Sequence, residues 1–220
     1  MHRRSLSTEL STTVAQASRV ELPAEILEFG IDQVMESGIL RDAPFVGWIA
    51  KGMEIRSSIS DQLFFKKILR FLTQLKSLGD DEKKEFSQKV ESDPAFREKV
   101  GDRLLLALDR LDEPAKSEFL ARCFDCFLTG HLSYEEFSEL AQLIDRSLLH
   151  DLEALEDSTY RFKESDFMRL VSCGLSVFKL GLPLLDEGVE IKYSFSRGGI
   201  LLQKAFQGGL KEFIEEERET

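Results

Sequence analysis

The spacing of apolar residues along the chain predicts helices over most of its length. The clearest amphipathic segment opens with the hydroxyl residues Ser57 and Ser58 and continues to Gly79, with apolar residues three and four positions apart. These apolar residues are Ile59, Leu63, Phe64, Ile68, Leu69, Leu72 and Leu75. The pattern predicts a helix with one face buried in a core.

Similar spacing on both sides of this segment predicts about six or seven helices in all. They lie between Pro23 and about residue 155, and loops of roughly two to six residues separate them, which favours antiparallel neighbours. We therefore predict a multi-helix bundle over residues 21–156. Residues 1–20 are rich in Ser and Thr and show no sustained period, so we expect a mobile N-terminal tail.

The stretch "DCFLTGHLSYEEF", residues 125–137, shares some features with a calcium-binding EF-hand loop. Gly130 and Glu136 occupy the matching positions, but Phe127 stands where an oxygen ligand is required. A helix corner explains the same residues: Gly130 ends one helix, and Ser133 with Glu136 forms a capping box that opens the next. We therefore expect no calcium site, and we expect Asp125 on a solvated side of its helix.

Residues 157–220 show a different pattern from the rest of the chain. A short helical segment ends at Gly174, two apolar stretches flank the turn signal "DEG", and the strand-like "IKYSF" leads to a Ser that caps a last helix. This order resembles the wing of a winged-helix module. The matching positions are Leu170, Val171, Gly174, Leu175, Tyr193, Phe195, Ser196, Gly199 and Leu202. The predicted fold class is mainly α: a helical bundle followed by a small winged-helix-like α+β element.

The amino-acid composition limits the classes of function that this protein can have. A formal net charge of −11 disfavours broad attraction to nucleic acid, because phosphate binding requires a surplus of Lys and Arg. No run of about 18 apolar residues predicts a transmembrane helix. The three cysteines occur without a signal peptide, which predicts a reducing, cytoplasmic setting.

Motifs for catalysis or for metal binding are not found in the sequence. It contains no Gly-rich phosphate loop, no H-E-x-x-H and no G-x-S-x-G. Cys123 and Cys126 could join His131 and Cys173 in a zinc site, but two cysteines in an amphipathic helix are more often small buried side chains. We therefore expect a non-enzymatic protein with no cofactor and no metal.

Two internal stretches and the C-terminal segment together resemble an uncharacterised bacterial helical family akin to the Abi-alpha abortive-infection proteins, which lie near phage-defence genes. The stretches are "LRDAPFVGWIAKGMEIRSSISDQLFFKKILRFL" and "GDRLLLALDRLDEPAKSEFLARCFDCFLTGHLSYEEFSELAQLID". The resemblance covers roughly residues 30–205 and rests on apolar spacing and turn residues. It implies a bacterial, antiviral context and assigns no functional residue.

Three surfaces are candidates for binding. An apolar segment flanked by glycines suits a partner or a membrane surface, although a helix hairpin buried in the core is the more common explanation of such a pattern. Its residues are Phe45, Trp48, Ile49 and Met53. The second candidate is a basic helix face, for which an ordinary solvated face is the alternative interpretation. Its residues are Lys66, Lys67, Arg70 and Lys76. The candidate wing comprises Lys192, Tyr193 and Arg197.

These features predict an interaction or sensing protein of bacterial phage defence, whose partner is another protein or a second copy of itself. A nucleic-acid-binding regulator that uses the C-terminal wing is one alternative. A membrane-surface effector built on residues 43–76 is the other.

Overall fold

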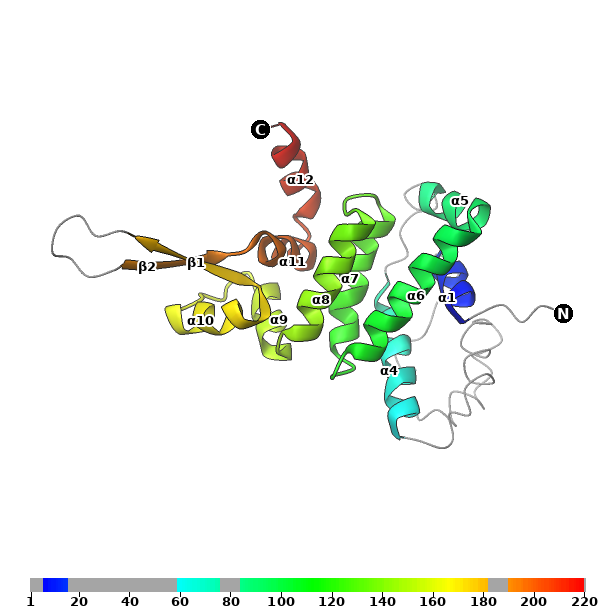
Figure 1. Cartoon of the computed structure of the whole chain (residues 1–220), viewed down its shortest axis with the longest axis horizontal. Helices are drawn as coiled ribbons and strands as arrows, with labels where there is room; N and C mark the ends of the chain where they lie inside the picture. Colours follow the sequence, from blue (N-terminus) through cyan, green and yellow to red (C-terminus); the bar gives the residue numbers. More distant parts are fainter. Residues whose placement is uncertain (1–5, 16–58, 76–83, 182–189, 220) are drawn as a thin grey trace. The chain divides into compact units, whose positions relative to one another are not determined.

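A computed structural model describes residues 6–15, 59–75, 84–181 and 190–219 (Figure 1). These residues form ten helices and one two-stranded antiparallel sheet, which confirms the predicted mainly helical class. The elements are α1 (Leu6–Ala15), α4 (Ile59–Gln74), α5 (Lys84–Ser92), α6 (Pro94–Arg110), α7 (Lys116–Leu128), α8 (Tyr134–Arg146), α9 (Leu149–Glu156), α10 (Glu164–Cys173), β1 (Ser176–Gly181), β2 (Glu190–Phe195), α11 (Arg197–Gln207) and α12 (Leu210–Glu219).

The chain divides into two compact units, Met1–Gly130 and His131–Thr220. The division falls at the glycine of the predicted helix corner, whereas the sequence placed a boundary near residue 157. The reason is that α8 and α9 both pack against α11, so these two helices belong with the C-terminal residues.

In the first unit, α1 corrects the expectation of a mobile tail. The helix packs against α5 and α6, and its Leu10 and Val14 are fully buried. Gly101 on α6 permits this close approach, because a Cβ atom there would lie 2.0 Å from the backbone oxygen of Ser7. Two buried apolar residues and one facing glycine therefore dock a helix whose sequence is otherwise rich in Ser and Thr.

The core of the first unit contains an aromatic cluster, to which α4, α5 and α7 contribute. The Phe124 ring packs edge-on against Phe71 at 5.7 Å and against Phe86 at 6.2 Å between ring centroids. Edge-to-face pairs of this kind contribute stability beyond the area that they bury. The predicted face of α4 is buried only in its later turns, since Ile59 is 78% exposed.

In the second unit, short-range signals set the ends of the helices. Ser133 and Glu136 form the predicted capping box at the start of α8. Gly174 ends α10 in the left-handed conformation, with φ of 89°. Ser196 caps α11, and a Cβ atom at Gly199 would lie 2.1 Å from the backbone oxygen of Leu175. These residues fix the two ends of the segment that contains the sheet.

The sheet is a hairpin of β1 and β2 that contacts α10 (Figure 1). Its strands pair in continuous register from Ser176 opposite Phe195 to Gly181 opposite Glu190. Figure 1 shows that the strands extend beyond the end of α10. Among the described helices, α10 therefore lies against the base of the hairpin.

Candidate functional site

The predicted apolar partner surface lies outside the described residues. This applies to all four of its members, Phe45, Trp48, Ile49 and Met53, and also to Lys76 of the predicted basic face. The remaining candidates lie on α4, on β2 and at the start of α11.

The basic residues of α4 do not form one solvent-facing surface, which corrects the prediction. Lys67 is buried, and its Nζ atom donates a hydrogen bond of 2.9 Å to the backbone oxygen of Asp109 near the end of α6. Arg70 forms an ion pair with Glu118. Since a lysine ammonium interacts favourably with the last carbonyls of a helix, Lys67 serves the packing of α4 on α6. Lys66 alone of these three is exposed.

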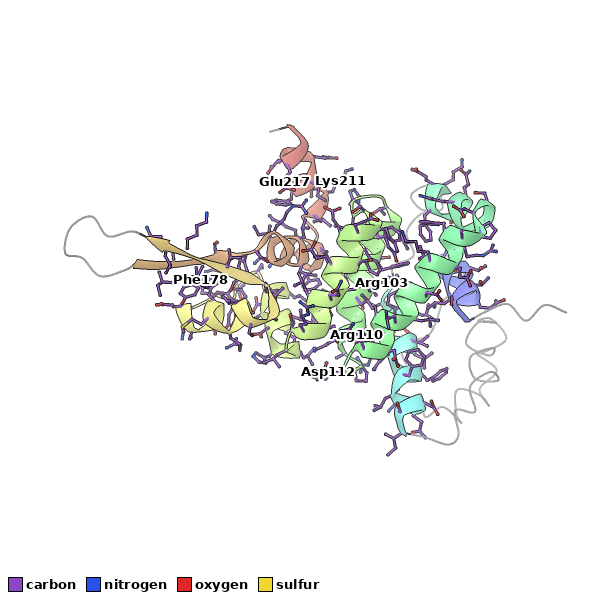
Figure 2. The ribbon with its side chains drawn as sticks, viewed as in Figure 1. Arg103, Arg110, Asp112, Phe178, Lys211 and Glu217 are labelled. Carbon is purple, nitrogen blue, oxygen red and sulfur yellow. The ribbon has the colours of Figure 1, made fainter. Side chains whose placement is uncertain are left out.

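Arg197, predicted as part of a wing, is held by two carboxylates. Its guanidinium donates to Glu136 of α8 at 3.0 Å and to Glu217 of α12 at 3.1 Å; Glu217 is labelled in Figure 2. Burial opposes the charge of Arg197, but the hydrogen bonds to both carboxylates outweigh it and raise its pKa. Arg197 therefore ties α8, α11 and α12 together.

The other two wing residues, Lys192 and Tyr193, lie on opposite faces of the hairpin. Residues paired across an antiparallel sheet share a face, and successive residues alternate between faces. One face thus carries Phe178, Leu180, Ile191 and Tyr193, and we call it the apolar face. The other carries Val177, Lys179, Lys192 and Ser194, together with the pair of Gly181 and Glu190, and we call it the lysine face.

The apolar face is exposed to solvent beyond the base of the hairpin. Phe178, labelled in Figure 2, is 53% exposed, Leu180 is 61% exposed and Ile191 is 45% exposed. The Phe178 and Tyr193 rings lie 6.4 Å apart. Large apolar side chains gathered on one exposed surface often mark a binding site.

The base of the hairpin is fixed by aromatic packing and hydrogen bonds. The Phe195 ring packs against Phe162 at 5.0 Å and against Phe167 at 5.1 Å between centroids. Ser176 Oγ donates to the backbone oxygen of Phe167 at 2.7 Å, and Ser196 Oγ donates to that of Gly174 at the same distance. The apolar face is thus carried on a rigid base.

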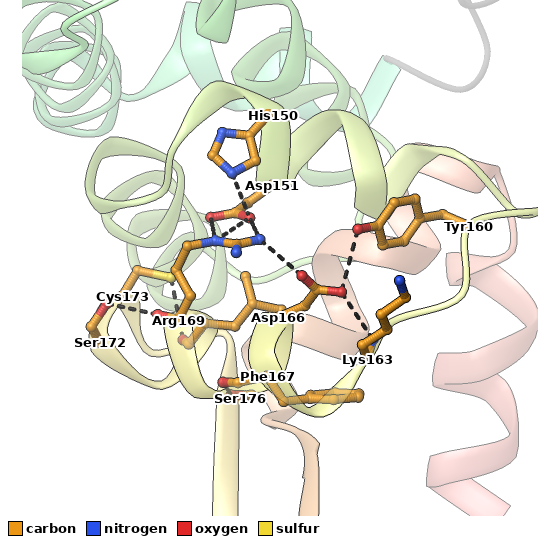
Figure 3. A network of polar contacts seen from close by, with 11 residues as sticks. His150, Asp151, Tyr160, Lys163, Asp166, Phe167, Arg169, Ser172, Cys173 and Ser176 are labelled. Atoms are coloured by element: carbon orange, nitrogen blue, oxygen red, sulfur yellow. Dashed lines mark hydrogen bonds and ion pairs between the residues drawn. The ribbon is translucent and has the colours of Figure 1, made fainter.

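A buried polar network holds α10, which supports this base (Figure 3). The carboxylate of Asp151 on α9 is 2% exposed, and Arg169 of α10 contacts its Oδ1 atom with Nε at 3.0 Å and Nη2 at 2.6 Å. Figure 3 shows the guanidinium between the carboxylates of Asp151 and Asp166. The second contact is longer, at 3.5 Å from Nη2 to Asp166 Oδ1.

Asp166 also fixes the start of α10. Its Oδ2 atom accepts hydrogen bonds from the backbone N–H of Lys163 at 2.9 Å and from the Tyr160 hydroxyl at 3.3 Å. The Lys163 N–H, with help from Tyr160 and Arg169, lowers the pKa of Asp166. Burial and the charge of Asp166 raise the pKa of Tyr160. Asp166 is therefore an anion throughout the neutral range.

The chemistry of this network is that of a structural clamp. His150 Nε2 lies 3.3 Å from Asp151 Oδ1, and Arg169 contacts the same carboxylate through two nitrogens. The sequence did not reveal the clamp, because Asp151 lies 18 positions before Arg169, across a polar stretch that reads as a linker. In the sequence, the only recognisable sign of the clamp is that Asp166 and Arg169 are three residues apart on one helix face.

The cysteines and the candidate metal ligands are distributed as follows. Cys123 and Cys173 are buried, and burial raises the pKa of the Cys123 thiol well above its ordinary value. Within the described ranges, His, Cys, Asp and Glu form no group of three that could hold a metal ion.

Over the same ranges, every helix is too short or too polar to cross a membrane.

Comparisons of the chain with protein-family models, with curated proteins and with solved structures found no match.

Proposed function

We propose that this protein is a non-enzymatic interaction protein of bacterial phage defence, and that it binds another protein through the apolar face of the β1–β2 hairpin. One observation carries the proposal: Phe178, Leu180 and Ile191, all around half exposed, lie together on a hairpin with a fixed base. The resemblance to abortive-infection proteins supports the setting in defence.

The physical reason is that rigid, exposed apolar groups lose little conformational freedom when a partner covers them. Aromatic side chains are enriched at protein interfaces for this reason, since they supply large contact areas with few rotatable bonds. The clamp of Asp151 and Arg169 adds to this rigidity by holding α10 beneath the hairpin base.

Site-specific cross-linking in bacterial cells tests the proposal. Photoreactive benzoylphenylalanine is placed at Phe178, and in a control protein at Leu106, which is 49% exposed on α6. We expect a discrete protein adduct from position 178 and none from position 106. Equal labelling from both positions, or none from either, would contradict the proposal. The defence setting is tested by plating efficiency on a phage panel, where Phe178→Ser should lose any protection that Leu106→Ser retains.

A nucleic-acid-binding regulator is the second candidate. It is supported by the order of α8, α9 and α10 before a hairpin, which resembles that of a winged helix, and by Lys179 opposite Lys192 on the hairpin. Against it, α10 occupies the place of a recognition helix and begins with Glu164 and Asp166, which repel phosphate. A gel shift at micromolar protein that is lost with Lys179→Glu would favour this function over protein binding.

A membrane-surface effector draws less support. The part of residues 43–76 that is described contains Lys67, which is buried, and Arg70, which is paired with Glu118. Flotation with anionic liposomes tests it, and recovery of the protein with the vesicles would favour it.

A further inference from the structure

The apolar face of the hairpin continues into the base, where a helix already covers it. Residues two apart along a strand point to the same side of a sheet, so Ser176 and Phe195 lie on the side of the apolar face. Both side chains contact α10. Ser176 Oγ donates to the backbone oxygen of Phe167 at 2.7 Å, and the rings of Phe195 and Phe167 lie 5.1 Å apart. The base of the apolar face is therefore packed against a helix.

The rest of the same face is open to solvent. Ser176 is 3% exposed, whereas Phe178 and Leu180, two and four positions further along β1, are 53% and 61% exposed. On β2, Ile191 is paired with Leu180 and is 45% exposed. The layer that α10 forms on this side of the sheet thus ends before the apolar residues do.

An exposed sheet face is covered by an element stacked on it, and not by one added beside it. A strand paired with the edge of β1 would extend the sheet sideways and leave Phe178 and Leu180 facing solvent. A helix is about 10–12 Å in diameter, and two strands about 5 Å apart present a surface of about that width with their side chains included. The open part of the face therefore fits a single helix.

The area of the face also fits a helix better than a folded domain. If a fully exposed large apolar side chain presents on the order of 150–200 Å², the exposed parts of Phe178, Leu180 and Ile191 amount to roughly 300 Å². A stable interface between two folded proteins needs about 800 Å² from each partner, so the face is too small for a stable homodimer. An amphipathic helix presents about three or four apolar residues in two turns, which is enough to cover it.

We infer that the apolar face accepts an amphipathic helix of the partner protein, which continues the layer that α10 begins at the base of the hairpin. The inference rests on the proposed function and adds the class of ligand to it. The apolar stripe of the bound helix covers Phe178, Leu180 and Ile191, and its polar side stays in water.

Two synthetic peptides test this with the full-length chain. Both have about fourteen residues of the same composition and no net charge. The leucines recur at intervals of three and four residues in the first peptide and at every second residue in the other. Binding is measured by fluorescence anisotropy, and amide chemical shifts locate it on the protein. We expect the helix-spaced peptide to bind about tenfold tighter and to shift amides of β1 and β2. Equal binding, a preference for the alternating peptide, or no binding of either overturns the inference.

Val177 provides a matched control for Phe178. The two residues are neighbours on β1 and are 42% and 53% exposed, but they lie on opposite faces of the hairpin. We expect Phe178→Ser to weaken the helix-spaced peptide about tenfold and Val177→Ser by less than about twofold, because only Phe178 lies on the covered face. Equal losses from both substitutions, with the hairpin amide signals retained, overturn the assignment to the apolar face.

Substitutions of Leu180 separate the face from the edge, and they provide the same test if Phe178→Ser unfolds the hairpin. Ser196 N donates to Leu175 O, and bonded pairs alternate along an antiparallel ladder, so the N–H of Leu180 points outward. Leu180→Ala removes the side chain, and Leu180→Pro also removes this N–H. We expect both to weaken the helix-spaced peptide by about threefold or more and to differ by less than about twofold. A tenfold greater loss with Leu180→Pro would show strand pairing and overturn the inference.

The other occupants of this surface give distinct results. A homodimer in sedimentation equilibrium that Phe178→Ser dissociates would assign the face to a second copy and overturn the inference. Binding to lipid vesicles that depends on Phe178 would overturn it as well. If cross-linking at Phe178 succeeds while both peptides fail, the proposed function stands and the helix inference alone is wrong.

Discussion

The clamp between Asp151 and Arg169 should contribute measurably to the stability of the second unit. The perturbation is a pair of charge-removing substitutions, the nearly isosteric Asp151→Asn and the shorter Arg169→Gln, made singly and together. Arg169→Gln leaves the buried Asp151 without its arginine, Asp151→Asn leaves Arg169 only the longer contact to Asp166, and the double substitution removes both charges. A cycle of these variants isolates the interaction between the two side chains.

The expected loss of stability follows from the solvent exposure of the Asp151 and Arg169 side chains. Breaking a fully buried ion pair destabilises a protein by about 3–5 kcal/mol, whereas exposed pairs contribute about 1 kcal/mol or less. Here the Asp151 side chain is 2% exposed, but that of Arg169 is 37% exposed, so water screens part of the attraction. We expect about 2 kcal/mol of destabilisation from each single substitution and a coupling energy of about 1 kcal/mol.

Urea unfolding followed by the tyrosine signal provides the assay. All three tyrosines, Tyr134, Tyr160 and Tyr193, belong to the second unit, so this signal reports on that unit. His150→Ala is the control, because the His150 side chain is 60% exposed and its loss should change stability by less than about 0.5 kcal/mol. A coupling energy below about 0.3 kcal/mol would refute the assignment of Asp151 and Arg169 as a clamp.

Three further predictions concern close packing and pH. Gly199→Ala would place a methyl group 2.1 Å from a main-chain oxygen, so we expect a loss of about 3 kcal/mol in urea unfolding, against about 1 kcal/mol for Gly208→Ala, which has open space but a φ of +84°. Gly101→Ala should release α1, and hydrogen exchange should then accelerate at residues 8–15 while α6 keeps its protection. The folded-state pKa values of Asp166 and Glu136 are lowered, so their stabilising contributions are complete above the unfolded values of about 4 and are lost as pH falls below them. Asp166→Asn and Glu136→Gln should each flatten the fall of unfolding free energy between about pH 5 and pH 3, and an unchanged slope would contradict this.

Short-range signals in the sequence predicted the ends of several elements correctly. Gly130 adopts φ of 74° at the corner after α7, and the capping box of Ser133 and Glu136 is present. Gly174 and Ser196 end α10 and cap α11 as expected. Each of these outcomes depends on residues within about four positions of one another, and sequence patterns report such neighbours directly.

Features that depend on distant residues were missed or wrongly assigned. The helix at residues 6–15 forms because Gly101, far along the chain, leaves room for it. Lys67 looked like a surface cation, yet the end of α6 provides an acceptor that buries it. Asp125, expected on a solvated side, is buried, because most of α7 is covered and only Glu118, Arg122 and Cys126 are partly exposed along it. Periodicity identifies the faces of a helix, but tertiary packing decides which polar groups become internal.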